Sequence, residues 1–376
     1  MMAMLDATRE QDADHRFAAG TLESFMADVL AAVGLPATDA AKVAQLMTEA
    51  DLTGADAHGI FRLAQYVRRV RAGGVNARPR ITVHKTAAAT ALVDGDNGMG
   101  HLVVSRAAET AIELAREAGV AWVGVRRSNH AGTAGLYAAM PVAHGMIGLY
   151  GAVANANHMA VWGGSELLLG TNPLGIAVPS GNGPVVLDMA TTVVSYGTVK
   201  KYALAGRDMP EGWFIDTRTG GTLTDPRRSA EGLLLPIGGY KGSGLAIMLG
   251  LLGGVLNGAA FGRDVIDFNY NQDGETNTGH FMVAIDIKRF VPLATFMAET
   301  DRHLADLRCS QRLPGVDRIR LPGDRRRDCR IERLRDGVPL PAALLAQLDK
   351  LAGELGVRTL GERTGLGGGL RNAVRS

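Results

Sequence analysis

The longest apolar stretch of the chain, LAIMLGLLGGVLNGAA, runs from Leu245 to Ala260. A membrane-spanning helix needs about 20 predominantly apolar residues. This run is shorter, contains Asn257 and several glycines, and lacks an aromatic belt. It therefore predicts a buried core helix in a globular protein, and we expect no membrane partner.

The charge balance and the cysteine count exclude several other classes of protein. Lys and Arg number 40 against 38 Asp and Glu, so the formal charge of +2 gives no global electrostatic argument for nucleic acid. The Arg-rich stretch from Arg318 to Arg335 contains no aromatic residue, which favours a solvated surface over an RNA-binding patch. Two cysteines among 376 residues cannot form a disulfide framework, so we expect a reducing, cytoplasmic location. The nine histidines are scattered, and we expect no metal site.

Strand-like and helical patterns alternate along most of the chain, which predicts an α/β or α+β fold. We expect an N-terminal helical segment over residues 1–80, a cofactor- and substrate-binding core over 81–310, and an Arg-rich segment with a helical tail over 311–376. The stretch GLGGGL at Gly365–Leu370 has no strand before it, so we reject it as a dinucleotide fingerprint. The sequence therefore predicts no ordinary Rossmann domain.

The segment DAHGIFR places His58 at the entry to a predicted helix, with Arg62 four residues later. On one continuous helix, both side chains would leave the same face. Such a pair suits an oxo or hydroxy acid, since arginine binds a carboxylate bidentately and histidine exchanges a proton near neutral pH. The structural alternative is a helix-capping histidine beside a solvated arginine.

A second candidate, SNHAGTAG, follows the predicted strand AWVGVRR and opens a helix. Small residues at such a turn let backbone N–H groups approach a phosphate, and His130 lies at its mouth. A helix start chosen for close packing explains the same residues equally well. Two weaker candidates are Asp188, at the end of an apolar strand, and Lys241, held between glycines before the apolar run.

Taken in order, these pieces resemble the malate/L-lactate dehydrogenase family, whose members lack the Rossmann fold. The resemblance covers roughly residues 31–327. It rests on eight collinear segments: DAHGIFRLAQYVRRVRAGGV, SNHAGTAG, WGGSELLLGTNP, VLDMATT, MPEGWFID, TDP, LLPIGGYKGSGLAIMLGLL and LPGDRR.

This resemblance implies an α/β fold with a mixed sheet, a homodimer, NAD or NADP as cofactor, and a 2-hydroxy acid/2-oxo acid pair as substrate. It implies catalytic roles for His58 and His130, either of which could exchange the proton. It also implies substrate binding by Arg62, Asn155 and Thr171. The implied cofactor-binding residues are His130, Ala131, Gly132, Thr133, Ala134, Asp188, Met189, Ala190, Tyr240, Lys241, Asp324 and Arg325.

The sequence departs from the family pattern where the serine before the catalytic histidine is replaced by Ala57. Ala154 and Val161 replace a threonine and a proline of the pattern, and Thr198 stands where imino-acid reductases have an acidic proton donor, which argues against that activity. The alternative to an oxidoreductase is thus a nucleotide-binding homologue with weak or altered activity. The sequence leaves open which 2-hydroxy acid is used and whether NAD or NADP is preferred.

Overall fold

The computed structural model describes residues 15–364, which divide into two compact units. Residues 68–325 form a central unit. Residues 15–67 and 326–364 form a terminal unit, so the two ends of the described chain fold together. The rejected fingerprint at Gly365–Leu370 lies outside the described residues.

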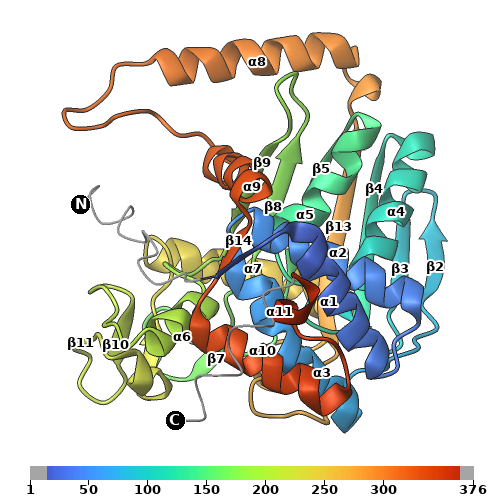
Figure 1. Cartoon of the computed structure of the whole chain (residues 1–376). Helices are drawn as coiled ribbons and strands as arrows, with labels where there is room; N and C mark the ends of the chain where they lie inside the picture. The colour runs from blue at the N-terminus through green and yellow to red at the C-terminus, as the bar shows by residue number, and fades with distance from the viewer. Residues whose placement is uncertain (1–14, 365–376) are drawn as a thin grey trace, which may run out of the picture. The chain divides into compact units, whose positions relative to one another are not determined.

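The central unit is built on a seven-stranded sheet with the order β2-β3-β4-β13-β5-β8-β9 (Figure 1). Strands β3 and β4 pair in parallel, and every other neighbouring pair is antiparallel. The expected α/β fold with a mixed sheet is therefore confirmed. The strands are β2 (Thr82–Ala87), β3 (Thr90–Asp94), β4 (Val120–Ser128), β5 (Met146–Ala152), β8 (Leu174–Val178), β9 (Val185–Met189) and β13 (Thr278–Asp286).

Helices cover both faces of this sheet, and two glycines of β5 show how closely they pack. A Cβ on Gly148 would lie 2.0 Å from the carbonyl oxygen of Ala138 in α5 (Ala134–Ala139). A Cβ on Gly151 would instead meet the ring of Phe281 and the side chain of Leu249 in α7 (Tyr240–Gly253). Residues three apart on a strand face opposite sides, so α5 and α7 lie on opposite faces. The long helix α4 (Gly100–Ala118) packs on β3, β4 and β13.

The apolar run forms α7 and a short 3-10 helix, η5 (Val255–Asn257). Its prediction as a buried helix is correct for only one face. Ala246 and Leu249 are buried, whereas Met248, Leu251, Val255 and Leu256 are exposed. An amphipathic pattern could not reveal this exposure, because the run is apolar on both faces. Within residues 15–364, no helix combines the length and apolar character needed to cross a bilayer.

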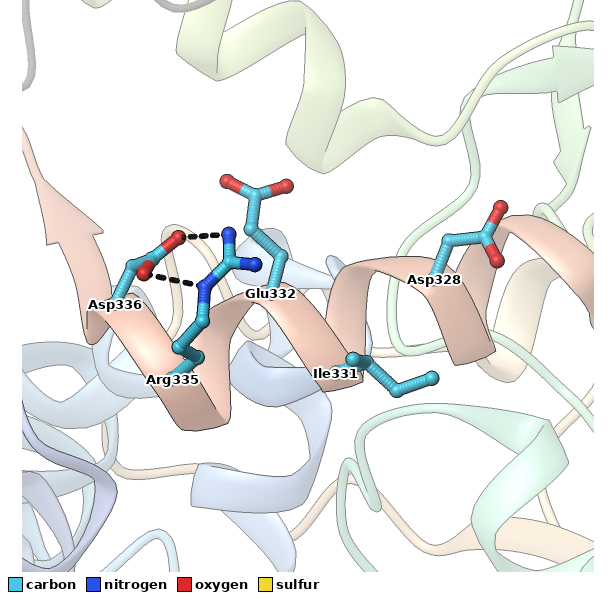
Figure 2. A pocket seen from close by; sticks show the side chains of 5 residues that line it. All are labelled: Asp328, Ile331, Glu332, Arg335 and Asp336. Carbon is cyan, nitrogen blue, oxygen red and sulfur yellow. Dashed lines mark hydrogen bonds and ion pairs between the residues drawn. The ribbon is translucent and has the colours of Figure 1, made fainter.

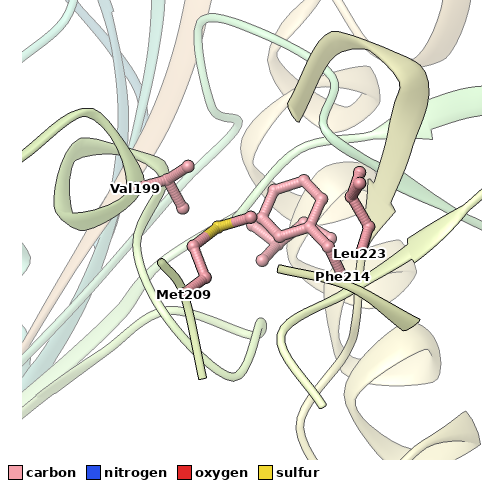
Figure 3. Close-up of a cluster of buried hydrophobic side chains, with 5 residues drawn as sticks. Val199, Met209, Phe214 and Leu223 are labelled. Atoms are coloured by element: carbon pink, nitrogen blue, oxygen red, sulfur yellow. The ribbon is translucent and has the colours of Figure 1, made fainter. Parts of the chain in front are cut away.

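A small lobe follows β9 within the central unit. Helix α6 (Tyr196–Leu204) packs beside a three-stranded sheet of β10 (Phe214–Asp216), β11 (Thr222–Leu223) and β12 (Gly232–Leu234). Its core holds five buried side chains, four of which Figure 3 labels. They are Val199, Met209, Phe214, Leu223 and Leu234.

The terminal unit joins the two ends of the chain. Strand β1 (His15–Phe17) pairs antiparallel with β14 (Val338–Leu340), with Phe17 opposite Val338. The helices are α1 (Ala19–Ala32), α2 (Ala37–Leu52), α10 (Ala342–Leu355) and α11 (Leu360–Arg363); α3 (Leu63–Ala72) and α9 (Asp324–Asp336) each begin in one unit and end in the other.

The prediction that the Arg-rich stretch forms a solvated surface is only partly correct, because one of its arginines is buried. Arg333 is 6% exposed and pairs with the carboxylate of Asp56 and the backbone carbonyl of Asp51. Arg330 pairs with Glu49 at 2.7 Å. These arginines hold the helices of the terminal unit together, since a buried guanidinium needs carboxylate or carbonyl acceptors.

Candidate active site

His58 and Arg62 do not lie on one continuous helix, so the predicted one-turn spacing is wrong. His58 ends one 3-10 helix, η1 (Asp56–His58), and Arg62 ends another, η2 (Ile60–Arg62). The break falls at Gly59, where a Cβ would lie 1.9 Å from a carboxylate oxygen of Asp51. That carboxylate accepts a hydrogen bond from the N–H of Ile60 at 2.8 Å and replaces the helical backbone acceptor.

The guanidinium of Arg62 is buried, and two of its hydrogen bonds go to neutral acceptors. Its Nε donates to the backbone oxygen of Ala57 at 2.8 Å, and Nη1 donates to Gln65 Oε1 at 2.7 Å. Arg62 is 5% exposed, and burial lowers its pKa below the ordinary value. An arginine remains charged under such conditions, so this group is a preorganised cation suited to a carboxylate.

His130 lies in the turn between β4 and α5, as the sequence predicted. The chain enters this turn through Arg127, which has a φ of 48°, and Arg127 N–H donates to Asn277 Oδ1 at 2.8 Å. Asn277 is also left-handed, with a φ of 42°, and the β4–β13 register shifts beside it. Such conformations cost about 1–3 kcal/mol each and cluster at functional sites.

Phe268 contacts both His130 and Asn155. The His130 ring stacks on Phe268 with 5.2 Å between ring centroids. The backbone N–H of Phe268 donates to the carbonyl oxygen of Asn155 at 3.0 Å. Asn155 is 6% exposed, and its side-chain Nδ2 donates to Thr278 Oγ1. The structure thus links His130, through the ring and backbone of Phe268, to the backbone of Asn155, whose side chain is buried.

The turn after His130 is held by Asp188. Carboxylate oxygen Oδ2 of Asp188 accepts a hydrogen bond from Gly135 N–H at 2.7 Å, in the first turn of α5. Asp188 therefore caps a helix from another part of the chain rather than the helix that follows its own strand. Ala131 is fixed separately, because its carbonyl accepts from the hydroxyl of Tyr137 at 2.5 Å. These contacts place residues 131–134 beside the end of β9.

Hydrogen bonds to Thr191, just after β9, bring two further predicted segments to this end of the strand. The N–H and hydroxyl of Thr191 both donate to the carbonyl oxygen of Thr171 at 3.0 Å. Ile237 N–H donates to the carbonyl of Thr191 at 3.0 Å, which anchors the turn before Tyr240 and Lys241. The Tyr240 side chain itself is 64% exposed.

Asp324 also approaches β9, through the glycine before it. A Cβ on Gly323 would lie 3.2 Å from Val186 N. Asp324 Oδ1 accepts from Arg308 at 2.9 Å, and Oδ2 accepts from the N–H of Leu321. It lines a surface cavity of about 500 Å³ at the end of α8 (Leu293–Cys309) and the loop that follows it. The other lining residues are Arg308, Cys309, Ser310, Arg312, Asp317, Arg318 and Ile319; Arg325 follows Asp324 and is exposed.

A second surface cavity, of about 370 Å³, lies along α9 in the terminal unit (Figure 2). It is lined by Asp328, Ile331, Glu332, Arg335 and Asp336, and Arg335 and Asp336 pair with each other at 2.6 Å. None of the predicted site residues lines it. In the described part of the chain, no group of three or more His, Cys, Asp or Glu side chains is arranged to hold a metal ion.

A dinucleotide would be held by residues 131–134 and by the end of β9, and one observation supports that fit. The hydroxyl of Thr133 is buried and makes no hydrogen bond within residues 15–364. A buried hydroxyl without a partner is costly, so its presence here suits a site where a ligand group completes the hydrogen bond.

Sequence reasoning missed a chain of buried polar groups behind the His130 turn. The Tyr150 hydroxyl lies 2.8 Å from His280 Nδ1, and His280 Nε2 lies 3.1 Å from Ser128 Oγ. Burial lowers the pKa of His280 to about 3, so this imidazole is neutral. The three residues come from β5, β13 and β4, and only the strand pairing brings them together. No local pattern in the sequence could have identified them.

We expect His280 to make the native state sensitive to acid. Its pKa is about 3 in the folded protein and about 6.5 when unfolded, so only the unfolded chain takes up a proton between these values. The free energy of unfolding should therefore fall, by about 1.4 kcal/mol per pH unit for this histidine, as pH decreases below its unfolded pKa.

Urea unfolding between about pH 6 and pH 5 measures this effect. The variant His280→Gln should show a smaller pH slope than wild type, whatever its absolute stability. The exposed His84 in β2 provides the matched control, since His84→Gln should leave the slope unchanged. Equal slopes for wild type and His280→Gln would contradict the prediction.

The fold is an α/β one built on a mixed sheet, and the cluster around His130 lies at the end of strand β4. Comparison with known proteins makes this specific: the chain belongs to the malate/L-lactate dehydrogenase family, which matches residues 17–349. The malate dehydrogenase of Pyrococcus abyssi is 38% identical over 352 residues, covering 90% of this chain and 94% of that protein. The structure of malate dehydrogenase from Pyrococcus horikoshii OT3 superposes with a TM-score of 0.84 at 34% identity, covering 92% of this chain and 97% of that chain.

The names of two other relatives state the cofactor that each uses. Ureidoglycolate dehydrogenase (NAD(+)) of Escherichia coli O157:H7 is 33% identical over 306 residues, covering 81% of this chain and 86% of that protein. (2R)-3-sulfolactate dehydrogenase (NADP(+)) of Chromohalobacter salexigens is 34% identical over 330 residues, covering 87% of this chain and 95% of that protein. The relatives are thus nicotinamide-dependent dehydrogenases of hydroxy acids, and both cofactors occur among them.

Proposed function

We propose that this protein is an NAD(P)-dependent oxidoreductase that interconverts a 2-hydroxy acid and its 2-oxo acid. The observation that carries the proposal is the cluster of His130, Phe268 and Asn155 at the turn after β4, in a chain that belongs to a family of hydroxy acid dehydrogenases. A histidine is the side chain best suited to exchange a proton with a hydroxyl group near neutral pH.

In the proposed reaction, His130 accepts the proton of the C2 hydroxyl during oxidation and returns it during reduction. The bound nicotinamide supplies the hydride chemistry. The buried guanidinium of Arg62 binds the substrate carboxylate, and Asn155 and Thr171 contribute further polar contacts. Residues 131–134, Asp188–Ala190, Tyr240, Lys241, Asp324 and Arg325 are the proposed cofactor-binding residues. His58 is the alternative proton carrier.

The direct test follows the absorbance of reduced nicotinamide with a panel of 2-oxo acids. The panel includes the oxo acids of malate, lactate and sulfolactate, each with NADH and with NADPH. Oxidation that depends on both the acid and the protein supports the proposal. Failure of the whole panel with both cofactors would refute it.

A second candidate function is nucleotide binding with weak or altered turnover, favoured by Ala57. This residue is 7% exposed and precedes His58, so no hydroxyl is available there to orient the imidazole. We expect Ala57→Ser to raise kcat by about tenfold if such a hydroxyl limits the reaction. Cofactor binding measured by calorimetry, without turnover in wild type or in Ala57→Ser, would support this candidate instead.

We also infer that the protein is a homodimer in the cytoplasm. The exposed apolar side chains Met248, Leu251, Val255 and Leu256 on α7 and η5 support self-association. The free cysteines Cys309 and Cys329 are compatible with a reducing compartment. Light scattering coupled to gel filtration, on wild type and on Met248→Glu, tests the dimer.

A further inference from the structure

A chain of buried side-chain hydrogen bonds links the residue before His130 to Asn155. Asn129 is 4% exposed, Thr276 and Thr278 are each 3% exposed, and Asn155 is 6% exposed. Thr276 Oγ1 lies 3.1 Å from Asn129 Oδ1 and 3.0 Å from Thr278 Oγ1, and Thr278 Oγ1 accepts from Asn155 Nδ2. Because all four groups are buried, each proton in the chain must have a definite position.

The orientation of the Asn129 amide fixes the first end of the chain. Its Nδ2 faces three oxygens: the carbonyl of Asn97 at 3.0 Å, Asn97 Oδ1 at 2.9 Å and the carbonyl of Gly98 at 3.0 Å. Three acceptor oxygens around this atom require the donor NH₂ group here rather than the amide oxygen, so Oδ1 must point the other way. There it faces donors, namely Arg69 Nη2 at 3.4 Å and the hydroxyl of Thr276.

The direction of each remaining hydrogen bond follows. Thr276 has one hydroxyl proton, and its oxygen lies 3.1 Å from two groups that only accept, Asn129 Oδ1 and the carbonyl of Ser128. Its proton therefore points to them, and Thr276 accepts from Thr278. The oxygen of Thr278 is then the acceptor for Asn155, which must present Nδ2 to it. The Asn155 amide cannot flip without leaving a buried donor or acceptor unpaired.

Asn155 thus turns its Oδ1 away from Thr278. In residues 15–364, no group donates a hydrogen bond to Oδ1 of Asn155, although its backbone carbonyl is paired with Phe268. Oδ1 of Asn155, the residue whose backbone is bonded to Phe268, is therefore an acceptor that remains open to whatever binds beside it.

We propose that Asn155 Oδ1 accepts a hydrogen bond from an N–H or O–H group of the bound ligand, and that Thr276 and Thr278 are positioning residues that fix this orientation. The inference rests on the proposed function, which supplies two such donors: the C2 hydroxyl of the substrate and the carboxamide NH₂ of the nicotinamide. The single proton of the C2 hydroxyl is required by His130, so the carboxamide is the favoured donor. On this assignment Asn155 orients the cofactor, which replaces the substrate contact that the family resemblance implied for it.

The test measures ligand binding to the full-length protein by calorimetry, with two matched pairs of ligands. One pair is NAD(+), or NADP(+) if that is the cofactor, and its 3-acetylpyridine analogue, which lacks the carboxamide N–H. The other pair is a 2-hydroxy acid in the presence of the reduced cofactor and its 2-oxo acid in the presence of the oxidised cofactor. These complexes do not react, so the dissociation constants report binding alone.

Thr278→Val removes the acceptor that fixes Asn155, while Thr278→Ser retains it. In one of the two pairs, we expect Thr278→Val to weaken the binding of the ligand that carries the donor by about fivefold to tenfold. The binding of the other ligand in that pair should be unchanged. If only the natural cofactor binds more weakly, the donor is the carboxamide. If only the hydroxy acid binds more weakly, the donor is the C2 hydroxyl. Thr278→Ser should restore wild-type binding. Adding Asn155→Leu to Thr278→Val should cause no further loss, because Thr278 acts through Asn155.

The assignment of Asn155 would be overturned if both ligands of each pair lost affinity equally, or if no ligand lost affinity. The proposed function would remain intact in both cases. Thermal unfolding of each variant separates these outcomes from a failure to fold. If correctly folded wild-type protein bound neither nicotinamide nor any acid, the proposed function would fail, and this inference with it.

Discussion

Replacing His130 with glutamine is expected to lower kcat by about 10²–10⁴-fold, the usual contribution of a general acid–base group. Glutamine keeps a polar side chain of similar length but cannot exchange a proton near neutral pH. Cofactor affinity should change little by comparison. Steady-state kinetics in both directions, with cofactor binding measured separately, provide the test. The part of the pH–rate profile that reflects a histidine should also disappear.

Two further variants make this result specific to His130. His144 is exposed at the end of η3 (Met140–His144), so His144→Gln should retain wild-type kcat. His58→Gln examines the alternative proton carrier under the same conditions. If His130→Gln kept kcat within about threefold while His58→Gln lost it, the proton would belong to His58 and the role of His130 would be wrong.

Replacing Arg62 with methionine is expected to lower kcat/KM for the acid by about 10²–10³-fold, since a buried charged partner of a carboxylate is lost. Arg62→Lys should recover only part of this loss, because an ammonium group cannot form the bidentate pair. Substrate saturation curves and cofactor titrations for both variants separate the loss of acid binding from any effect on the cofactor.

Arg62 also has a structural role, which the experiment must separate from binding. Its removal leaves the Ala57 carbonyl and Gln65 Oε1 without their donor, at a cost of about 1–3 kcal/mol in the free energy of unfolding. Kinetics should therefore be measured well below the melting temperature of each variant. The exposed Arg68 gives the control, since Arg68→Met should leave kcat/KM unchanged. An unchanged KM for the acid in Arg62→Met would exclude carboxylate binding by this residue.

Local sequence patterns predicted the features that depend on local chemistry. The strand–turn–helix around His130 follows from AWVGVRR and the small residues after it, and Asp188 lies one residue before the end of β9. The break at Gly59 was not predictable, because it depends on a carboxylate eight residues earlier that occupies the space of a Cβ. A run of helix-compatible residues therefore appeared continuous when the structure has two short 3-10 helices.

Features that depend on the pairing of strands far apart in the sequence could not be predicted, for a different reason. His280 lies in a strand whose neighbours are β4 and β5, and only their register brings Ser128 and Tyr150 to its two ring nitrogens. The same holds for Thr276 and Thr278, which reach Asn129 and Asn155 only after β13 has joined the sheet. Each residue type is ordinary in its local context, so composition and spacing carry no signal.

The pairing of β1 with β14 has a consequence for synthesis on the ribosome. Arg16 bonds to the carbonyl of Gly337 across 321 residues, so the terminal unit cannot be completed until nearly the whole chain has been made. At about 5–20 residues per second, the helices before Arg62 wait on the order of tens of seconds for their partners. The central unit can fold during that time. The segment that contains His58 and Arg62 therefore completes its folding last, and a nascent chain stalled before β14 would contain His130 without a complete terminal unit.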